Sequence, residues 1–245
     1  MDRELFGTTS FSKENFPGYR CPRCRSHLAL EDFSEEDNAE TQRDQRDPDF
    51  DADWVVRGFR ADLRCKSDRC GERVLCVGTG AVDTIHDQSG EGWDVAYVDR
   101  LTPQFFLPAL EVFELPPTTP REVRDSVLAS FKLLFLSSGS TLNEVRNALE
   151  FLMDHLKVPR ADGERSLSLH GRVQRMPAQY AQYRDQLLAV KWLGNAGTHA
   201  HPTRRSDVLD AYEILHHVLD GMFSDRVARV GLLVDKINQR KAPIE

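Results

Sequence analysis

Four of the five cysteines of this 245-residue chain occur as two close pairs, and these pairs constrain the fold of its N-terminal part more than any other feature. Cys21 and Cys24 are separated by two residues, whereas Cys65 and Cys70 are separated by four. A tight turn inside each pair can place both thiolates on one ion, and two such pairs complete a closed, tetrahedral four-sulfur site. The pattern therefore predicts a zinc ribbon in which these four residues bind a structural Zn²⁺ ion.

Two other interpretations of the cysteines are a disulfide framework and a set of unrelated free thiols. Disulfides persist in oxidising compartments, but residues 1–16 lack the apolar core of a signal peptide. No apolar run approaches the length of a membrane span, so we expect a cytoplasmic protein outside the membrane, which favours metal over disulfides. The fifth cysteine, Cys76, lies in the apolar run RVLCVG and is predicted to be a core residue. His27 lies near the first pair and is an alternative ligand.

Residues 31–53, between the two cysteine pairs, form an acidic segment. They contain eleven acidic residues against Arg43 and Arg46, a net charge of −9, while the whole chain carries −7. The remaining residues therefore carry a net charge of +2, which permits a local basic surface although the chain as a whole is acidic. Because the segment has few aliphatic residues with which to offset its ordering entropy, we expect a disordered, mobile insertion.

Short strand patterns flank the second cysteine pair. Residues 59–64 alternate apolar and charged side chains, which is typical of a half-buried strand. Residues 74–77 and 94–98 predict two more strands, with Gly78 and Gly80 in the turn that follows the first of them. We therefore expect a small antiparallel sheet that carries the zinc ribbon.

The second half of the chain has the periodicity of helices. Capping boxes at Thr119–Glu122 and Thr141–Glu144 open two of them, and apolar residues then recur at spacings of three and four. Later segments repeat this pattern, and their short connections predict antiparallel neighbours. The expected fold class is α+β: a zinc-ribbon domain with its small sheet over residues 1–115, followed by an up-and-down bundle of five or six helices over residues 116–245.

Several polar residues of this half have ordinary interpretations. Arg146 and Glu150 are spaced i, i+4 and are predicted to form an ion pair on the surface of their helix. His170 and Arg172 lie in a polar stretch and are predicted to be solvated.

The run LLAVKWLGNAGTHAH combines a helix pattern with polar residues at its end. Leu188 and Trp192 give an apolar side at i, i+4 spacing, and Lys191, Asn195 and His199 would share another face if the helix continued. Such a set is a plausible polar site. The alternative is a capped helix terminus, at which His is favourable beside the last carbonyl groups.

The same run carries a resemblance to a known family. Gly194 and Asn195, then small residues and His199, together with the run EVRNALE at 144–150 and the order of the helices, resemble the family catalogued as domain of unknown function 4145 (DUF4145) over residues 115–223. That family is grouped with the HEPN superfamily (higher eukaryotes and prokaryotes nucleotide-binding), which includes many ribonucleases of defence and toxin systems. The HEPN signature is Arg, often followed by Asn, and then His. Asn195 and His199 match it, whereas Gly194 stands at the Arg position.

The resemblance implies a HEPN-like bundle that forms a homodimer, with RNA, another nucleic acid or a partner protein of a defence system as its binding partner. An active member would be a metal-independent ribonuclease in which His199 is the acid–base residue and Asn195 orients His199 or the phosphate. Lys191 would then replace the cation that is absent at Gly194. The glycine favours the other function: a non-catalytic nucleic-acid- or protein-binding module of a prokaryotic defence system, anti-phage or restriction-associated.

Overall fold

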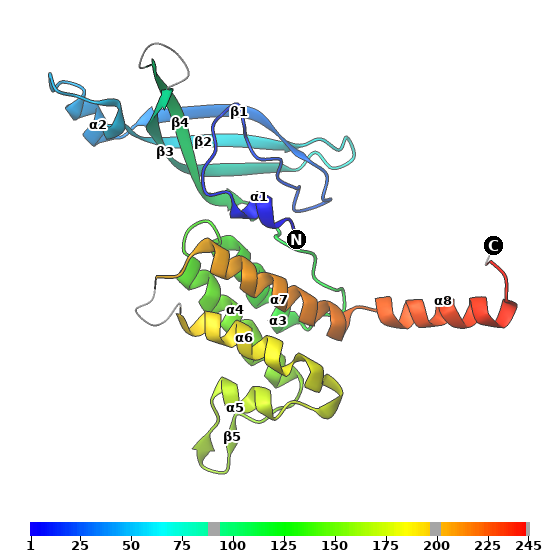
Figure 1. Cartoon of the computed structure of the whole chain (residues 1–245). Coiled ribbons are helices and arrows are strands. Elements are labelled where there is room, and N and C mark those ends of the chain that lie inside the picture. Colours follow the sequence, from blue (N-terminus) through cyan, green and yellow to red (C-terminus); the bar gives the residue numbers. More distant parts are fainter. Residues whose placement is uncertain (88–93, 197–201, 244–245) are drawn as a thin grey trace. The chain divides into compact units, whose positions relative to one another are not determined.

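A computed structural model describes residues 1–87, 94–196 and 202–243 of the chain (Figure 1). Contacts between residues divide the chain into two compact units. The sheet unit comprises residues 2–112 and 131–138, and the helical unit comprises Met1, residues 113–130 and residues 139–245. None of the helices among the described residues combines the length and the apolar character that crossing a membrane requires.

Four antiparallel strands form one sheet in the sheet unit, in the order in which they follow along the chain. They are β1 (Leu28–Asp37), β2 (Val56–Cys65), β3 (Arg73–Asp87) and β4 (Asp94–Leu107). Strand β2 has the predicted alternation, because Phe59, Ala61 and Leu63 are buried whereas Arg60 and Arg64 are exposed. The predicted antiparallel sheet is therefore confirmed, with longer strands than the sequence indicates.

The core of the sheet unit is rich in aromatic rings. Tyr19 is fully buried, and its ring centroid lies 5.0 Å from that of Phe106 and 6.2 Å from those of Phe6 and Phe16. Cys76 is also fully buried, and burial raises the pKa of its thiol to about 12. The prediction that Cys76 is a core residue is confirmed.

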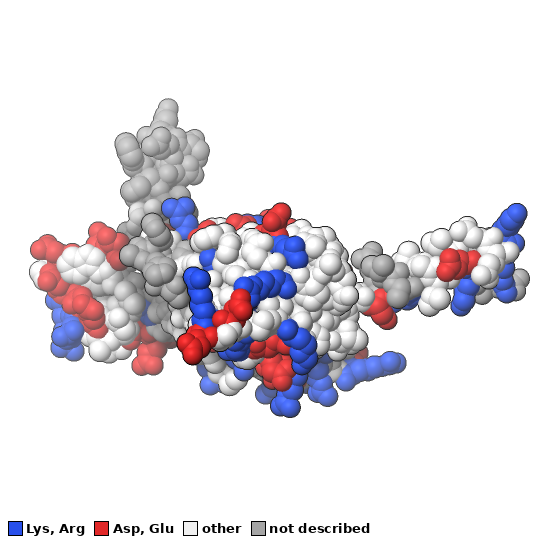
Figure 2. Space-filling model, turned by 90° about the horizontal axis from the view of Figure 1, so that it is seen from below, with Lys and Arg blue, Asp and Glu red and all other residues white. Residues whose placement is uncertain are grey.

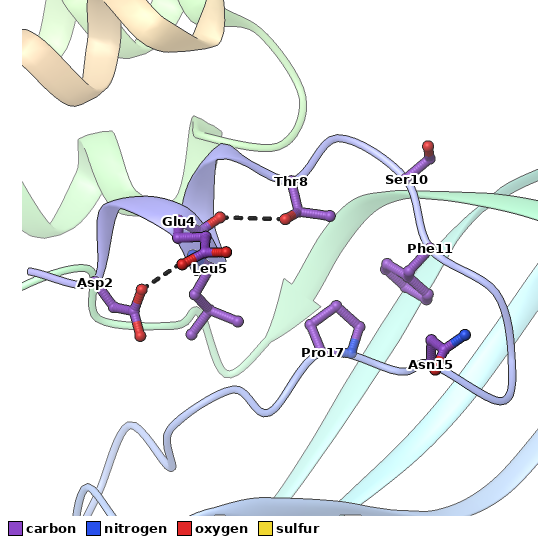
Figure 3. A pocket seen from close by; sticks show the side chains of 8 residues that line it. All are labelled: Asp2, Glu4, Leu5, Thr8, Ser10, Phe11, Asn15 and Pro17. Atoms are coloured by element: carbon purple, nitrogen blue, oxygen red, sulfur yellow. Dashed lines mark hydrogen bonds between the residues drawn. The ribbon is translucent and has the colours of Figure 1, made fainter.

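The N-terminal segment of the sheet unit begins with the short helix α1 (Arg3–Gly7). The carboxylate of Asp2 caps it by accepting from the Leu5 backbone N–H at 3.0 Å, and the Thr8 hydroxyl donates to the Glu4 carbonyl at 3.1 Å (Figure 3). A pocket lies beside these groups and is also lined by Phe11. Because Asp2 and Thr8 complete the ends of α1, they have a structural explanation without a ligand.

The acidic segment 31–53 differs from the predicted mobile insertion, because most of it has regular structure. Residues 31–37 of the segment belong to strand β1. The helix α2 (Ala39–Asp44) and a 3-10 turn, η1 (Ala52–Trp54), follow. The reason is charge pairing across the sheet: Arg57 on β2 lies 2.9 Å from Asp37 and 3.4 Å from Glu35. Such cross-strand pairs offset the repulsion between carboxylates that the composition of the segment indicates.

Gly78 and Gly80 lie inside β3 and not in a turn, which corrects the sequence prediction. A Cβ atom on Gly78 would lie 2.1 Å from the Thr102 carbonyl oxygen and 2.6 Å from the ring of Phe59. The register of β3 against β4 shifts between Val77 and Gly78. Glycine at this position therefore marks a bulge and a close approach of neighbouring groups, which a glycine in a strand commonly does.

The helical unit contains the helices that the apolar periodicity predicts. In chain order they are α3 (Arg121–Leu133), α4 (Ser138–His155), α5 (Leu169–Gln174), the 3-10 turn η2 (Ala178–Tyr183), α6 (Arg184–Ala196), α7 (Arg205–Phe223) and α8 (Arg226–Arg240). A two-stranded hairpin, β5 (Ala161–Asp162) and β6 (Arg165–Ser166), precedes α5. Leu142, Val145, Leu149 and Leu152 on α4 are fully buried, so the predicted stripe of this helix faces the core.

Candidate functional site

The four paired cysteines converge on one point of the sheet unit. Their sulfur atoms all lie within 4.8 Å of one another, with 3.3 Å between Cys24 and Cys65 and 3.8 Å between Cys21 and Cys70. Cys21 and Cys65 are buried, whereas Cys24 is exposed. The two predicted pairs therefore form one cluster although forty residues separate them along the chain.

Two tight turns place these thiols. In the first, the Arg25 backbone N–H donates to the Cys21 carbonyl at 2.9 Å, and Arg25 adopts a left-handed φ of 64°. In the second, Gly71 adopts a φ of 62° and its backbone N–H donates to the Ser67 carbonyl at 3.2 Å. Glycine meets such a φ without steric cost, which explains its place directly after Cys70.

The cluster has the dimensions of a four-thiolate metal site. Bonds of about 2.3 Å from a tetrahedral zinc ion to sulfur place the sulfur atoms about 3.8 Å apart. The two cross-pair distances of 3.3 and 3.8 Å lie near this value. The four cysteines are therefore compatible with a bound metal ion.

Helix α6 of the helical unit is rotated relative to the sequence prediction. Trp192, predicted to lie on the apolar side, is 58% exposed, whereas Lys191 is only 8% exposed. The residues of α6 that are fully buried are Leu187 and Val190. Because a lysine has a long aliphatic stem, it can follow these residues into the interior while its ammonium group stays near the surface. The ammonium nitrogen lies 3.3 Å from the centroid of the Trp192 ring.

Arg146 of α4 lies against the same part of α6. A Cβ atom added to Gly194 would lie 3.0 Å from the Arg146 Cβ and 3.3 Å from the Leu142 carbonyl oxygen. Burial, and then the positive charge of Arg146, lower the pKa of Lys191. The absence of a side chain at Gly194 thus lets α6 approach α4 closely, with two cationic side chains at the contact.

The predicted ion pair between Arg146 and Glu150 is not formed. The Arg146 Nε atom is buried without a hydrogen-bond partner, and Glu150 accepts from Arg172 instead. Within the described parts of the chain, neither Arg146 nor Lys191 forms an ion pair. Two neighbouring cations without a carboxylate repel each other, so the arrangement favours a bound anion.

Arg172 is buried, which corrects the prediction that it is solvated. Its side chain is 1% exposed; it forms an ion pair with Glu150 and donates to Asp154 at 2.6 Å and to the Val158 carbonyl at 2.9 Å. The short helix α5 presents Arg172 inward together with Leu169, which is also buried. Arg172 therefore connects α5 to α4, and the acids that it needs lie far away in the sequence.

The structure brings together part of the predicted polar site. Lys191 and Asn195 are one turn apart on α6, as predicted, and Asn195 is half-buried. His199 lies outside the described residues. The sequence prediction assigned Arg146 to an ion pair with Glu150 and not to this site, although its place among the apolar residues of EVRNALE indicated a side chain close to the core.

Comparisons with known families divide the chain into two parts. Residues 9–106 match the family model described as "Domain of unknown function (DUF8608)". No curated protein and no solved structure matches the chain. Residues 129–241, which include α4, α6 and α7, match the family model described as "Domain of unknown function (DUF4145)", the family that the sequence resembles.

Proposed function

We propose that the chain is a non-catalytic, RNA-binding module of a prokaryotic defence system that acts in the cytoplasm. The observation that carries this proposal is the pair of cations, Lys191 and Arg146, at the contact of α6 and α4. A phosphate group accepts charge-assisted hydrogen bonds from both an ammonium and a guanidinium group, so it would relieve their mutual repulsion.

The packing at Gly194 supports a binding function over catalysis. The HEPN signature has Arg at this position, but even a Cβ atom would lie 3.0 Å from Arg146 and 3.3 Å from the Leu142 carbonyl oxygen. A side chain at this position therefore requires Arg146 and the Leu142 backbone to shift by a few tenths of an ångström. The alternative function, a ribonuclease, depends on His199. It predicts that the wild type cleaves RNA and that His199→Ala does not.

We also infer that the four-cysteine cluster binds Zn²⁺ and that this ion is structural. Four sulfur ligands leave no open coordination position for a substrate or a water molecule. When bound, the ion would hold the two turns together, and Cys21, Cys24, Cys65 and Cys70 would be its ligands. The role of the sheet unit in this proposal is therefore stability, and RNA binding is assigned to the helical unit.

A binding experiment tests the assignment of Lys191 and Arg146. We expect Lys191→Met and Arg146→Met each to weaken binding of a fluorescein-labelled single-stranded RNA at least about tenfold, because each removes a phosphate contact. Each should also reduce the slope of log Kd against log salt concentration by about one. Fluorescence anisotropy of the full-length protein measures both effects, and Lys132→Met, which changes an exposed lysine of α3, is the matched control.

The pH dependence of binding provides a second readout. Because burial and Arg146 lower the pKa of Lys191, this residue loses its charge at a lower pH than an exposed lysine. Binding by the wild type should therefore weaken as the pH rises toward that pKa, whereas binding by Lys191→Met should not show this step. Wild-type affinity in both methionine variants would contradict the phosphate assignment. RNA cleavage by the wild type that His199→Ala abolishes would overturn the non-catalytic proposal.

A further inference from the structure

Helix α8 has an apolar stripe that is exposed. Val230, Leu233, Val234 and Ile237 follow the i, i+3, i+4, i+7 spacing of one helix face, and they are between 42% and 49% exposed. Helix α8 extends away from the other helices of its unit (Figure 1). A contiguous exposed apolar face is typical of an interaction site, and an isolated helix of this length is only marginally stable in water.

Basic residues follow one edge of this stripe. Arg229, Lys236 and Arg240 are spaced i, i+7 and i+11, which places them in a row beside the apolar face. Asp235 lies on the other side of the helix by the same geometry. Figure 2 shows the projecting helix with its white surface beside blue basic side chains. The face of α8 is therefore apolar with one positive edge.

The helical unit also has a groove with the complementary character, between α6 and α7. Its volume is about 560 Å³, and apolar atoms supply most of its surface. On the α7 side, Asp210 and Glu213 are both exposed and lie one turn apart. The residues that line the groove are Ala189, Trp192, Leu193, Asp210, Glu213 and Ile214. The groove is therefore apolar with one negative edge.

We propose that α8 of a second copy of this chain occupies the groove between α6 and α7, and that the exchange is reciprocal. The apolar stripe would cover Trp192, Leu193 and Ile214, and the basic row would lie along the acidic edge. Lys236 and Arg240 are one helical turn apart, as are Asp210 and Glu213, so two aligned helices can form both ion pairs. Exchange of an identical element is a recognised route to a closed two-fold dimer.

The connection between α7 and α8 favours a second copy over the same chain. Only Ser224 and Asp225 join the two helices. The Ser224 backbone N–H donates to the Asp220 carbonyl at 2.9 Å, and the Asp225 carbonyl accepts from the Arg229 backbone N–H at 2.8 Å. With these bonds in place α8 extends away from the other helices of its unit (Figure 1) and its apolar stripe is exposed, so its own chain does not fill the groove. This inference does not depend on RNA binding, and its test leaves Lys191 and Arg146 unchanged.

Charge reversal tests the interface on the full-length protein. We expect the wild type to be a dimer in sedimentation and light-scattering measurements. Lys236→Glu combined with Arg240→Glu should raise the dissociation constant at least about 100-fold, because two attractive pairs become repulsive. Adding Asp210→Lys and Glu213→Lys to that variant should restore the dimer, because attraction returns with the signs exchanged. Asn238→Glu adds a negative charge away from the basic row and is the control; it should leave the dimer unchanged.

Cysteine pairing identifies the partner directly. Copies that carry Ile214→Cys should form a disulfide with separately tagged copies that carry Val234→Cys, since that bond can form only between chains. A monomeric wild type, or a dimer that Lys236→Glu with Arg240→Glu leaves intact, would overturn the proposal. A chain with both cysteines that forms the bond internally while remaining a monomer would also overturn it, because α8 would then occupy its own groove. Circular dichroism confirms that each variant retains its helices.

Discussion

Replacing Cys65 by Ser should release the metal and unfold the sheet unit, while much of the helical circular dichroism signal remains. Cys65 is the buried last residue of β2, so it connects the four-cysteine cluster directly to the sheet. Binding of a structural zinc ion contributes on the order of 10 kcal/mol to the folding of such sites, which exceeds the stability of most small domains. The helical unit should persist because residues such as Leu149, Val190 and Leu215 form an apolar core of its own.

Elemental analysis and thermal unfolding check this result. Protein purified without chelator should contain about one zinc ion per chain, and Cys65→Ser should contain almost none. Cys76→Ala is the matched control, because Cys76 is equally inaccessible but lies outside the cluster. It should keep the metal and lose only about 1 kcal/mol or less of stability, since few atoms leave the core. Wild-type protein without zinc, or a Cys65→Ser variant with an unchanged unfolding transition, would refute the assignment.

The second large effect is expected at Arg172. Arg172→Met should destabilise the helical unit by about 2–3 kcal/mol, because it removes charge-assisted hydrogen bonds to Glu150 and Asp154, whose side chains are 26% and 35% exposed. Arg160 also forms an ion pair with Asp154, but its side chain is 66% exposed. Arg160→Met should therefore change the free energy of unfolding by about 1 kcal/mol or less. Urea unfolding followed by circular dichroism measures both variants, and equal effects would show that burial of Arg172 has no energetic importance.

The same network predicts a pH dependence. Hydrogen bonds from Arg160 and then from Arg172 lower the pKa of Asp154 in the folded protein. A depressed carboxyl pKa stabilises the folded state above the unfolded-state pKa of about 4, and this contribution is lost as the pH falls toward the lower folded-state value. The difference in stability between the wild type and Arg172→Met should therefore become smaller in acid. A difference that stays constant from pH 7 to acid would contradict this explanation.

Features that depend on neighbouring residues in the chain could be predicted from the sequence. The two cysteine pairs and the alternation along β2 are of this kind. Each depends on the spacing of residues a few positions apart. The chemistry of such features is therefore visible in the order of the residues. The predicted capping boxes were wrong, because α4 begins at Ser138, before Thr141, and the Thr119 hydroxyl accepts no hydrogen bond from a described residue.

Features that depend on distant partners could not be predicted in this way. The acidic strand β1 needs Arg57, which pairs with Asp37 across the sheet, and composition alone gives no sign of that pairing. Arg172 lies in a polar stretch of the sequence, but its side chain is buried because Glu150 and Asp154 of α4 accept its hydrogen bonds. The burial of Lys191 likewise depends on how α6 packs on its neighbours. The sequence of α6 has several apolar residues in a row, so its periodicity does not show which face of the helix is buried.

The close approach of α6 to α4 at Gly194 couples substitutions on the two helices. Gly194→Arg would place its Cβ atom 3.0 Å from the Arg146 Cβ and 3.3 Å from the Leu142 carbonyl oxygen. Shortening Arg146 would not relieve this contact, because every residue except glycine keeps a Cβ atom at that position. The two helices would instead have to move apart by a few tenths of an ångström, so the effect of a new side chain at 194 depends on the residues that set the spacing of α4 and α6.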